Sequence, residues 1–315
     1  MTPEIAASLD SINVNMSKGG GMTVINVVLA FVMFGVALGI KPKMFIEVFK
    51  KPKSVIVGAC SQLILLPAFT FCLALLFGKW ITPMMALGMI LVAACPGGNI
   101  SNFISSLSKA NIELSVSLTA ISTALAVFTT PFNFWFWGNL YLKFAPVASS
   151  VPYLTIPLME VFKTIFILLG IPLVLGILCS QFLPKVADKL KKPLQWISII
   201  FFIAMVILSF SSNITAFLQC IKYIFLVVLI HNFLALSIGF CTATAFKLPW
   251  QDRRTLTIET GIQNSGLGLA LLLGTNIFAG FPPHGGMLVI TAWWGIWHII
   301  SGLTVATIFN KTKKI

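Results

Sequence analysis

Charged side chains are scarce in this chain of 315 residues, and acidic ones most of all. Only 9% of the residues are charged and only 8 are Asp or Glu, whereas a soluble domain averages about 25% charged residues. This scarcity excludes the ordinary soluble class. It also means that a carboxylate inside an apolar segment stands out as a candidate functional group.

Catalytic and metal-binding motifs are lacking as well. The chain has 3 His and 6 Cys, with no CxxC pair and no His beside a Cys at metal-ligand spacing. It has no HExxH sequence, no aspartate pair within an apolar run, and no Ser–His pair with a supporting acid. The cysteines are therefore interpreted as packing residues, and we do not expect an enzyme.

Apolar residues, by contrast, are abundant. They make up 58% of the chain, and the mean hydropathy is +0.99. They fall in runs of roughly twenty residues, the length that crosses the hydrocarbon of a bilayer as a helix, and not in the alternating segments of a membrane barrel. We predict an all-α polytopic membrane protein with nine transmembrane helices. Their expected ranges are 22–40, 54–77, 83–108, 111–138, 159–183, 193–211, 220–246, 253–275 and 285–310.

The net charge of +13 follows the side of the membrane. With nine crossings, most Lys and Arg fall in loops on one side, with clusters at 41–53, 185–192 and 247–254 and at the end of the chain. The positive-inside rule then puts the N-terminus outside and the C-terminus in the cytoplasm, in a plasma or inner membrane. We expect membrane lipids around the protein and no nucleic acid partner.

Two of the expected helices are interrupted at mid-depth by polar and glycine-bearing stretches. One interruption is Pro96-Gly97-Gly98, and the other runs from Glu259 to Gly266. Proline removes a backbone donor and glycine loosens a helix, so both helices are expected to be unwound there. Interrupted helices in corresponding places of two oppositely oriented halves indicate an inverted-repeat transporter.

This pattern divides the chain into four parts. We expect an extracytoplasmic tail over 1–21, a first repeat of four helices over 22–140, a second repeat of five helices over 141–310, and a cytoplasmic tail over 311–315. The first tail is rich in Ser, Asn and Gly, and we expect it to be flexible. The halves are unequal, as though the first helix of the first repeat were missing.

Glu259 is the acidic residue that we expect deepest in the membrane. A charged carboxylate there costs several kcal/mol or more unless it has a partner or a watery cavity, and no Lys or Arg is expected at the same depth. A cation that binds and leaves fits this position. Side-chain oxygens of Ser101 and Asn102 stand at the first interruption, and Ser115 and Thr119, four residues apart, share one helix face.

The residues at both interruptions resemble those of the bile acid:sodium symporter family. The most specific stretches are Cys95-Pro-Gly-Gly-Asn-Ile-Ser-Asn102 and Ile258-Glu-Thr-Gly-Ile-Gln-Asn-Ser-Gly266. Supporting stretches are Leu229-Ile-His-Asn232, Gln62 with Leu66-Pro67, and Trp297-His298 with Ser301-Gly302. The resemblance runs from about Ala30 to Ile308. It implies a panel domain and a core domain, two crossing broken helices in the core, and the nine-helix variant of the fold.

The resemblance also implies two sodium sites with a substrate site beside them. The first sodium site would use the side chains of Ser101, Asn102, Ser115, Thr119 and Glu259. The second would use the side chains of Gln62 and Gln263, with backbone carbonyls near Glu259, Thr260 and Ile262. The substrate would be contacted by Asn99, Asn264 and His298.

Two residues near the expected substrate depart from bacterial members of the family. Asn99 stands where those relatives often have Thr, and Ile299 follows His298 where they have Asn. The sequence therefore leaves open whether the organic anion is a bile acid-like conjugate or a small keto or hydroxy acid. The oligomeric state is open as well.

Together these features favour a sodium-coupled secondary active symporter that imports an organic anion by alternating access. The alternative is proton-coupled symport with Glu259 as the proton carrier, although a proton needs one base and no shell of oxygens. A channel would need a repeated pore-lining pattern, which the sequence does not supply. Away from the interruptions, His231 and Asn232 are expected to form a structural hydrogen-bonding pair.

Overall fold

The structure is a computed structural model that describes residues 3–12, 21–40, 52–78, 80–145, 155–211, 214–273, 277–278 and 283–312. Several expected features lie wholly or partly outside these ranges. They are the part of the N-terminal tail over 13–20, the basic loop over 41–51, the end of the helix expected at 253–275, and the last residues of the C-terminal tail, 313–315.

The helices follow the order of the expected membrane segments. In chain order they are α1 (Pro3–Asp10), α2 (Gly21–Ala37), α4 (Pro52–Cys60), the π-helical η1 (Ser61–Leu65), α5 (Leu66–Phe77), α6 (Pro83–Ala94), α7 (Ile100–Leu107), α8 (Ile112–Phe144), α9 (Leu158–Ile165), the π-helical η3 (Phe166–Gly170), α10 (Ile171–Phe182), α11 (Pro184–Ser211), α12 (Ile214–Ala245), α13 (Trp250–Gly261), α14 (Ser265–Leu273) and α15 (Gly285–Lys311).

Five helical stretches among the described residues are long and apolar enough to cross a membrane. They are Pro52–Phe77, Ile112–Phe144, Leu158–Phe182, Cys220–Ala245 and Gly285–Lys311. The two interrupted segments miss this length because each consists of two short helices, α6 with α7 and α13 with α14. The chain is therefore a polytopic helical membrane protein, and the count of nine crossings stays a prediction.

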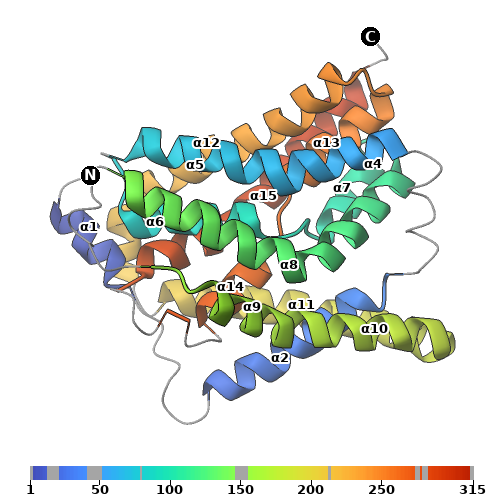
Figure 1. Cartoon of the computed structure of the whole chain (residues 1–315), viewed down its shortest axis with the longest axis horizontal. Coiled ribbons are helices and arrows are strands. Elements are labelled where there is room, and N and C mark those ends of the chain that lie inside the picture. Colours follow the sequence, from blue (N-terminus) through green and yellow to red (C-terminus); the bar gives the residue numbers. More distant parts are fainter. Residues whose placement is uncertain are drawn as a thin grey trace.

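The helices are arranged in two layers. We call α2, α9, α10 and α11 the panel layer; it runs along the lower edge of Figure 1, with the remaining membrane helices, the core layer, above it. Within the panel layer, a Cβ on Gly35 of α2 would lie 2.8 Å from the Cβ of Leu194 in α11. Small residues let helix backbones approach closely where hydrophobic burial drives no association.

The N-terminal helix α1 departs from the flexible tail that we expected. Leu9 and Ile12 are buried, with 0% and 3% of their surface exposed, and α1 packs against α12 and α15. The Thr82 hydroxyl, 2.9 Å away, donates to Asp10 Oδ1, and the same hydroxyl accepts from the backbone N–H of Met85, which caps α6. Apolar residues spaced on one helix face thus dock a segment whose average composition is polar.

Near the C-terminal end of α15, one turn of α13 forms hydrogen bonds to the ends of several other helices. The Asp252 carboxylate accepts from a hydroxyl of α4 at 2.6 Å and from the amide of Asn111, the N-cap of α8, at 2.8 Å. Arg254 donates to the carbonyl of Ser108 after α7 at 2.9 Å and to that of Thr312 after α15 at 3.0 Å. These bonds fix the N-terminal part of α13, the helix that places Glu259 in the interior of the protein.

Candidate functional site

The first interruption lies between α6 and α7. Proline disfavours the helical conformation of the residue before it, and Cys95, which precedes Pro96, has φ −70° and ψ 156°. The chain turns helical again at Ile100. The helix expected over 83–108 is therefore broken at the proline and glycine pair that predicted the break.

The second interruption lies between α13 and α14, and it rests directly on the first. Gly97 and Gln263 form an antiparallel backbone bridge. The Gly98 N–H donates to the Ile262 carbonyl at 2.9 Å, and the Asn264 N–H donates to the carbonyl before Gly97 at 2.8 Å. Backbone polar groups at membrane depth must be satisfied inside the protein, and here each broken helix satisfies the other.

Both glycines at the crossing are required by close approach. A Cβ on Gly97 would lie 2.8 Å from Gln62 Nε2 and 3.2 Å from Glu259 Oε2, and a Cβ on Gly98 would lie 3.1 Å from the Gln263 carbonyl oxygen. A side chain at position 98 would press on the backbone of the second interruption, and one at position 97 would displace the side chains of Gln62 and Glu259.

Glu259 is buried at the crossing, with 1% of its surface exposed. Ser101 Oγ donates to its Oε1 at 2.6 Å, Thr119 Oγ1 donates to its Oε2 at 2.9 Å, and the Ser115 hydroxyl contacts Oε1 as well. Asn102 Oδ1 lies 2.9 Å from Ser115 Oγ. The hydrogen-bond partners of this carboxylate in the described part of the chain are hydroxyls, so it is not held by a structural ion pair.

Three helices supply this first cluster. Ser101 and Asn102 lie in the first turn of α7, Ser115 and Thr119 face them from α8, and α13 carries Glu259. Sequence reasoning missed a sixth member.

That missed residue is Ser122. Its hydroxyl accepts from the Gly97 N–H at 3.2 Å and donates to the Thr119 carbonyl at 3.2 Å. It follows Thr119 by three residues, so it lies on the same face of α8. That spacing was the signal that could have found it.

A second cluster gathers at the backbone carbonyls of Glu259 and Thr260. Gln62 Nε2 donates to the Glu259 carbonyl at 3.1 Å, and Gln263 Nε2 donates to the Thr260 carbonyl at 2.8 Å. The Ile262 carbonyl is taken by the crossing itself. Both glutamines are at most 1% exposed, and within the described ranges the Oε1 atom of each has no hydrogen-bond partner.

Two amide oxygens buried without a donor are costly, and they are the ligands that a hard cation takes. A half-turn of each amide about its last side-chain bond would also exchange the Nε2 atoms that now cover two carbonyls for oxygens. The residues expected for the second site therefore fit a cation by their donor chemistry. Glu259 belongs to both clusters, by its carboxylate to the first and by its carbonyl to the second.

A cavity of about 630 Å³ lies between the panel layer and the crossing. The three residues expected to contact substrate all line it, namely Asn99, Asn264 and His298, and so does Ile299. The opposite wall is apolar and consists of side chains of α2 and α11, among them Met33 and Phe201. The polar groups of the cavity thus lie on the side of the crossing, where apolar side chains also line it, and the panel side is hydrocarbon.

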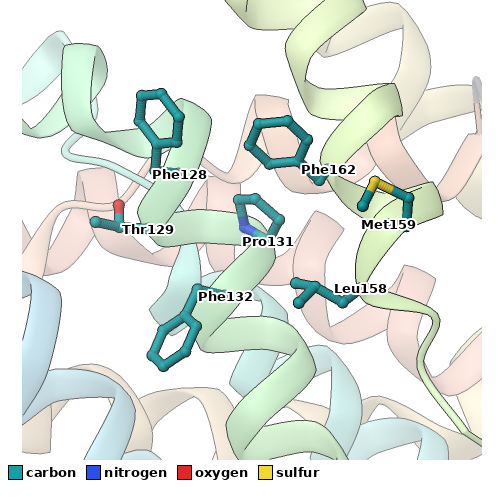
Figure 2. A pocket seen from close by; sticks show the side chains of 7 residues that line it. All are labelled: Phe128, Thr129, Pro131, Phe132, Leu158, Met159 and Phe162. Atoms are coloured by element: carbon teal, nitrogen blue, oxygen red, sulfur yellow. The ribbon is translucent and has the colours of Figure 1, made fainter.

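A second hollow, of about 520 Å³, lies between α8 and α9. Figure 2 shows Pro131 between Phe128 and Phe132 on α8, facing Leu158, Met159 and Phe162. Its one polar side chain, Thr129, donates to a carbonyl of its own helix at 3.1 Å. This groove offers nothing that would orient a polar substrate, so we do not assign it to transport.

His231 and Asn232 do not form the pair that we expected. His231 Nε2 lies 2.8 Å from Thr70 Oγ1 of α5, and Asn232 Nδ2 donates to the Gly261 carbonyl at 2.8 Å. Successive residues of a helix point in different directions, and for this reason each bonds a different neighbouring helix.

Comparison with known proteins supports the family resemblance found at the two interruptions. A model of the Sodium Bile acid symporter family matches residues 26–220. The sodium-dependent transporter YocS of Bacillus subtilis is 33% identical over 290 residues, which cover 92% of this chain and 84% of that protein. The human Sodium/bile acid cotransporter 4 is 29% identical over 257 residues, 81% of this chain and 56% of that protein. The human Ileal sodium/bile acid cotransporter is 27% identical over 245 residues, 78% and 67%.

Proposed function

Since this chain belongs to the Sodium Bile acid symporter family, a family of sodium-dependent membrane transporters and not of enzymes, we propose that it imports an organic anion together with sodium ions. The observation that carries the proposal is the environment of Glu259. This carboxylate is 1% exposed at the crossing of two broken helices, and hydroxyls from three residues surround it.

The first cluster suits a sodium ion as follows. Each hydroxyl oxygen that now donates to Glu259 has lone pairs, and rotation about its C–O bond turns those lone pairs toward a cation. The Asn102 amide oxygen adds a ligand from the neighbouring turn. A cation held by these oxygens would neutralise the carboxylate, which lowers the cost of keeping the charge in the membrane interior.

The second cluster suits a second sodium ion. Its ligands would be the Oε1 atoms of Gln62 and Gln263 and the carbonyls of Glu259, Thr260 and the adjoining Ile262. Because Glu259 contributes to both clusters, an ion in one fixes the backbone that forms the other. Binding of the two ions is therefore expected to be cooperative.

The cavity supports an amphipathic organic anion as the cargo. Helix N-termini favour negative charge through their free N–H groups and their dipole, and the first turns of α7 and α14 reach the cavity at Asn99 and Ser265. The apolar wall of α2 and α11 would contact a hydrocarbon body, as a bile acid-like molecule or a smaller carboxylate has. In our proposal the core layer shifts against the panel layer and exposes this cavity to each side in turn.

Proton coupling through Glu259 is the second candidate. A proton requires one basic oxygen, whereas six residues with oxygen-bearing side chains gather here and two further amide oxygens lie buried beside them. This excess of oxygen ligands favours sodium.

The test is uptake into proteoliposomes at constant pH, with sodium replaced by choline. A panel of labelled organic anions would first be chosen by sodium-dependent thermal stabilisation of the purified protein. Uptake that requires a sodium gradient, with counterflow of labelled substrate, is the expected result. Uptake driven by a pH gradient in the absence of sodium would show that the coupling ion is the proton.

Substrate and ion roles can also be separated by mutation. Replacing Asn99 or Asn264 by Ala is expected to change the relative KM values of different anions, because both side chains line the cavity. The sodium requirement should change less, since neither side chain belongs to the clusters around Glu259 and the glutamines. A changed sodium requirement with unchanged substrate preference would mean that these roles are reversed.

A further inference from the structure

Two buried asparagines outside the expected sites each donate to one backbone carbonyl beside the second cluster. Asn133 of α8 bonds the carbonyl next to Gln62, and Asn232 of α12 bonds the carbonyl of Gly261, two residues before Gln263. The exposed fractions of the two asparagines are 6% and 0%. In both cases the N–H four residues later, the donor in an α-helix, is either absent or bonded elsewhere.

The carbonyl that Asn133 bonds belongs to Leu63, in the π-helical turn η1. In this turn the bonds span five residues, as from the Leu66 N–H to the Ser61 carbonyl. Where the α-helical register resumes, the donor for Leu63 would be the N–H of the residue four positions later, but that residue is Pro67, which has no N–H. Asn133 Nδ2 lies 2.9 Å from this oxygen. A side chain of α8 thus replaces the missing backbone donor and holds the turn that carries Gln62.

The carbonyl that Asn232 bonds is the last one of α13. Its ordinary donor would be the N–H of Ser265, but after the interruption that N–H donates to the Gln263 carbonyl at 2.9 Å. Asn232 Nδ2 lies 2.8 Å from the Gly261 oxygen and takes its place. Contact on the same face of α12 is close, since a Cβ on Gly261 would lie 2.7 Å from Leu236 Cγ.

These two bonds decide which carbonyls can face a cation. In the interior of a membrane protein an unsatisfied carbonyl must find a donor or an ion, so the oxygens of Leu63 and Gly261 would otherwise compete with those of Glu259 and Thr260. With both oxygens occupied, the two glutamines and the carbonyls beside them keep fixed positions.

We propose that Asn133 and Asn232 are positioning residues for the second cation site, which they form by holding the turns of Gln62 and Gln263 without contacting the ion. The proposal rests on the sodium coupling proposed above. It goes beyond the ligands themselves by assigning roles to two residues on other helices.

The experiment compares Asn133→Leu and Asn232→Leu with Asn139→Leu. Leucine has nearly the shape of asparagine and cannot donate. Asn139, the control, also lies on α8 and donates to a backbone carbonyl, that of Ile156, at 3.2 Å. Each variant would be measured for the sodium half-saturation of uptake, the steepness of its sodium dependence, the substrate KM at saturating sodium, and the melting temperature without sodium.

The two test variants are expected to raise the sodium half-saturation about 10-fold, as loss of an outer contact to a metal ligand commonly does, and to make the sodium dependence less steep. Substrate KM at saturating sodium should stay near the wild-type value. The control should lose melting temperature at most. Equal sodium half-saturation in test and control variants would overturn the proposal, whatever happens to their stability.

If a leucine variant does not fold, the serine variants of Asn133 and Asn232 replace it in the experiment. The serine hydroxyl is too short to bond the carbonyl directly, and it leaves room for a water molecule. The same rise in sodium half-saturation is expected of them.

Failure of this inference is distinct from failure of the proposed function. Wild-type uptake without sodium dependence would remove the sodium coupling itself. Sodium-dependent wild-type uptake, together with test variants that match the Asn139 control, would remove only the positioning roles.

Discussion

At the scale of single residues, the chemistry converges on one carboxylate. Glu259 has its oxygens bonded to hydroxyls of α7 and α8 and its backbone carbonyl bonded to Gln62. These hydroxyl donors stabilise a charged carboxylate, and a neutral side chain at the same position would not need them. Substitution by the neutral isostere therefore tests the site without changing its shape.

Glu259→Gln is expected to abolish the sodium-induced rise in melting temperature and to reduce sodium-driven uptake at least about 100-fold, because the amide supplies no negative charge to hold the ion. Sodium titrations by thermal shift and by uptake measure both. Glu113→Gln, which changes an exposed carboxylate on α8, should match the wild type. Wild-type sodium dependence in Glu259→Gln would remove this residue from the mechanism.

The sequence predicted these residues better than their arrangement. Glu259 stood out because acids are rare, and the four-residue spacing of Ser115 and Thr119 put both on one face of α8. The roles of these residues stay predictions. Asn133 could not be found by pattern, because its partner is a carbonyl 70 residues away, in the turn before Pro67. Such a bond depends on tertiary packing, which no local spacing records.

At the scale of helices, close packing between α12 and α13 fixes the orientation of the latter. A Cβ on Gly239 of α12 would lie 2.8 Å from the Cα of Thr257 and would also contact the Leu256 carbonyl. The two helices are therefore in backbone contact along the turn before Glu259. Such contacts are a common means of holding membrane helices together.

Gly239→Ala is expected to lower stability by about 1–3 kcal/mol, the usual cost of overpacking, and to weaken sodium binding because α13 must shift. Melting temperature and sodium half-saturation are the measurements. Ala245→Val adds bulk at an exposed position of the same helix and should change neither quantity. A stable Gly239→Ala protein with ordinary sodium affinity would show that this backbone contact is not required.

The docking of α1 should depend on pH through Asp10. Burial raises the pKa of this carboxyl from 3.8 to about 6, although hydrogen bonds from Thr82 and from the Gly286 backbone act in the opposite direction. The folded protein therefore binds this proton more tightly than the unfolded chain does. Its contribution to stability is fully present below about pH 4 and is lost as pH rises through 6, an effect on the order of 2 kcal/mol.

Melting temperatures measured between pH 4 and pH 7.5 would show this dependence. In Asp10→Asn the side chain is always neutral and still accepts from Thr82, so this part of the pH dependence should disappear. Glu4→Gln, an exposed change on the same helix, should retain it. An unchanged pH profile in Asp10→Asn would mean that α1 docks independently of this proton.

At the scale of the whole molecule, the cavity lies between the two layers, and the two polar clusters around Glu259 and the glutamines lie inside the core layer. The proposed movement of one layer against the other would open the cavity to either side without taking the clusters apart. Two sodium ions carried with one monovalent anion would move one net positive charge inward.

Uptake should therefore increase when the inside of a proteoliposome is made negative, since 100 mV acts on one charge with about 2.3 kcal/mol. A potassium diffusion potential set with valinomycin provides the voltage, and labelled substrate provides the measurement. Counterflow at zero potential serves as the control for intact protein. Uptake that ignores the voltage would indicate a single sodium ion for each monovalent anion.

The sequence was informative about helices and poor on how they pack. Runs of apolar residues with Pro96 and the paired glycines placed the helices and both interruptions, because hydrocarbon thickness and backbone donors act locally. The docking of α1 was not predicted, because the average composition of this segment is polar although Ile5, Leu9 and Ile12 pack against the core. The two layers depend on contacts between distant segments, and only the family resemblance pointed to them.

The hydroxyls around Glu259 also matter for the step of a transport cycle in which the empty carrier returns. After it releases sodium and substrate, a symporter must return to its starting conformation empty, with its buried carboxylate still in the membrane interior. Hydrogens from Ser101, Ser115 and Thr119 can spread that negative charge over several atoms while no metal travels with it. At sodium concentrations that saturate the variant, removing one of these hydroxyls should thus slow net uptake more than one-for-one exchange, in which the carrier always crosses loaded.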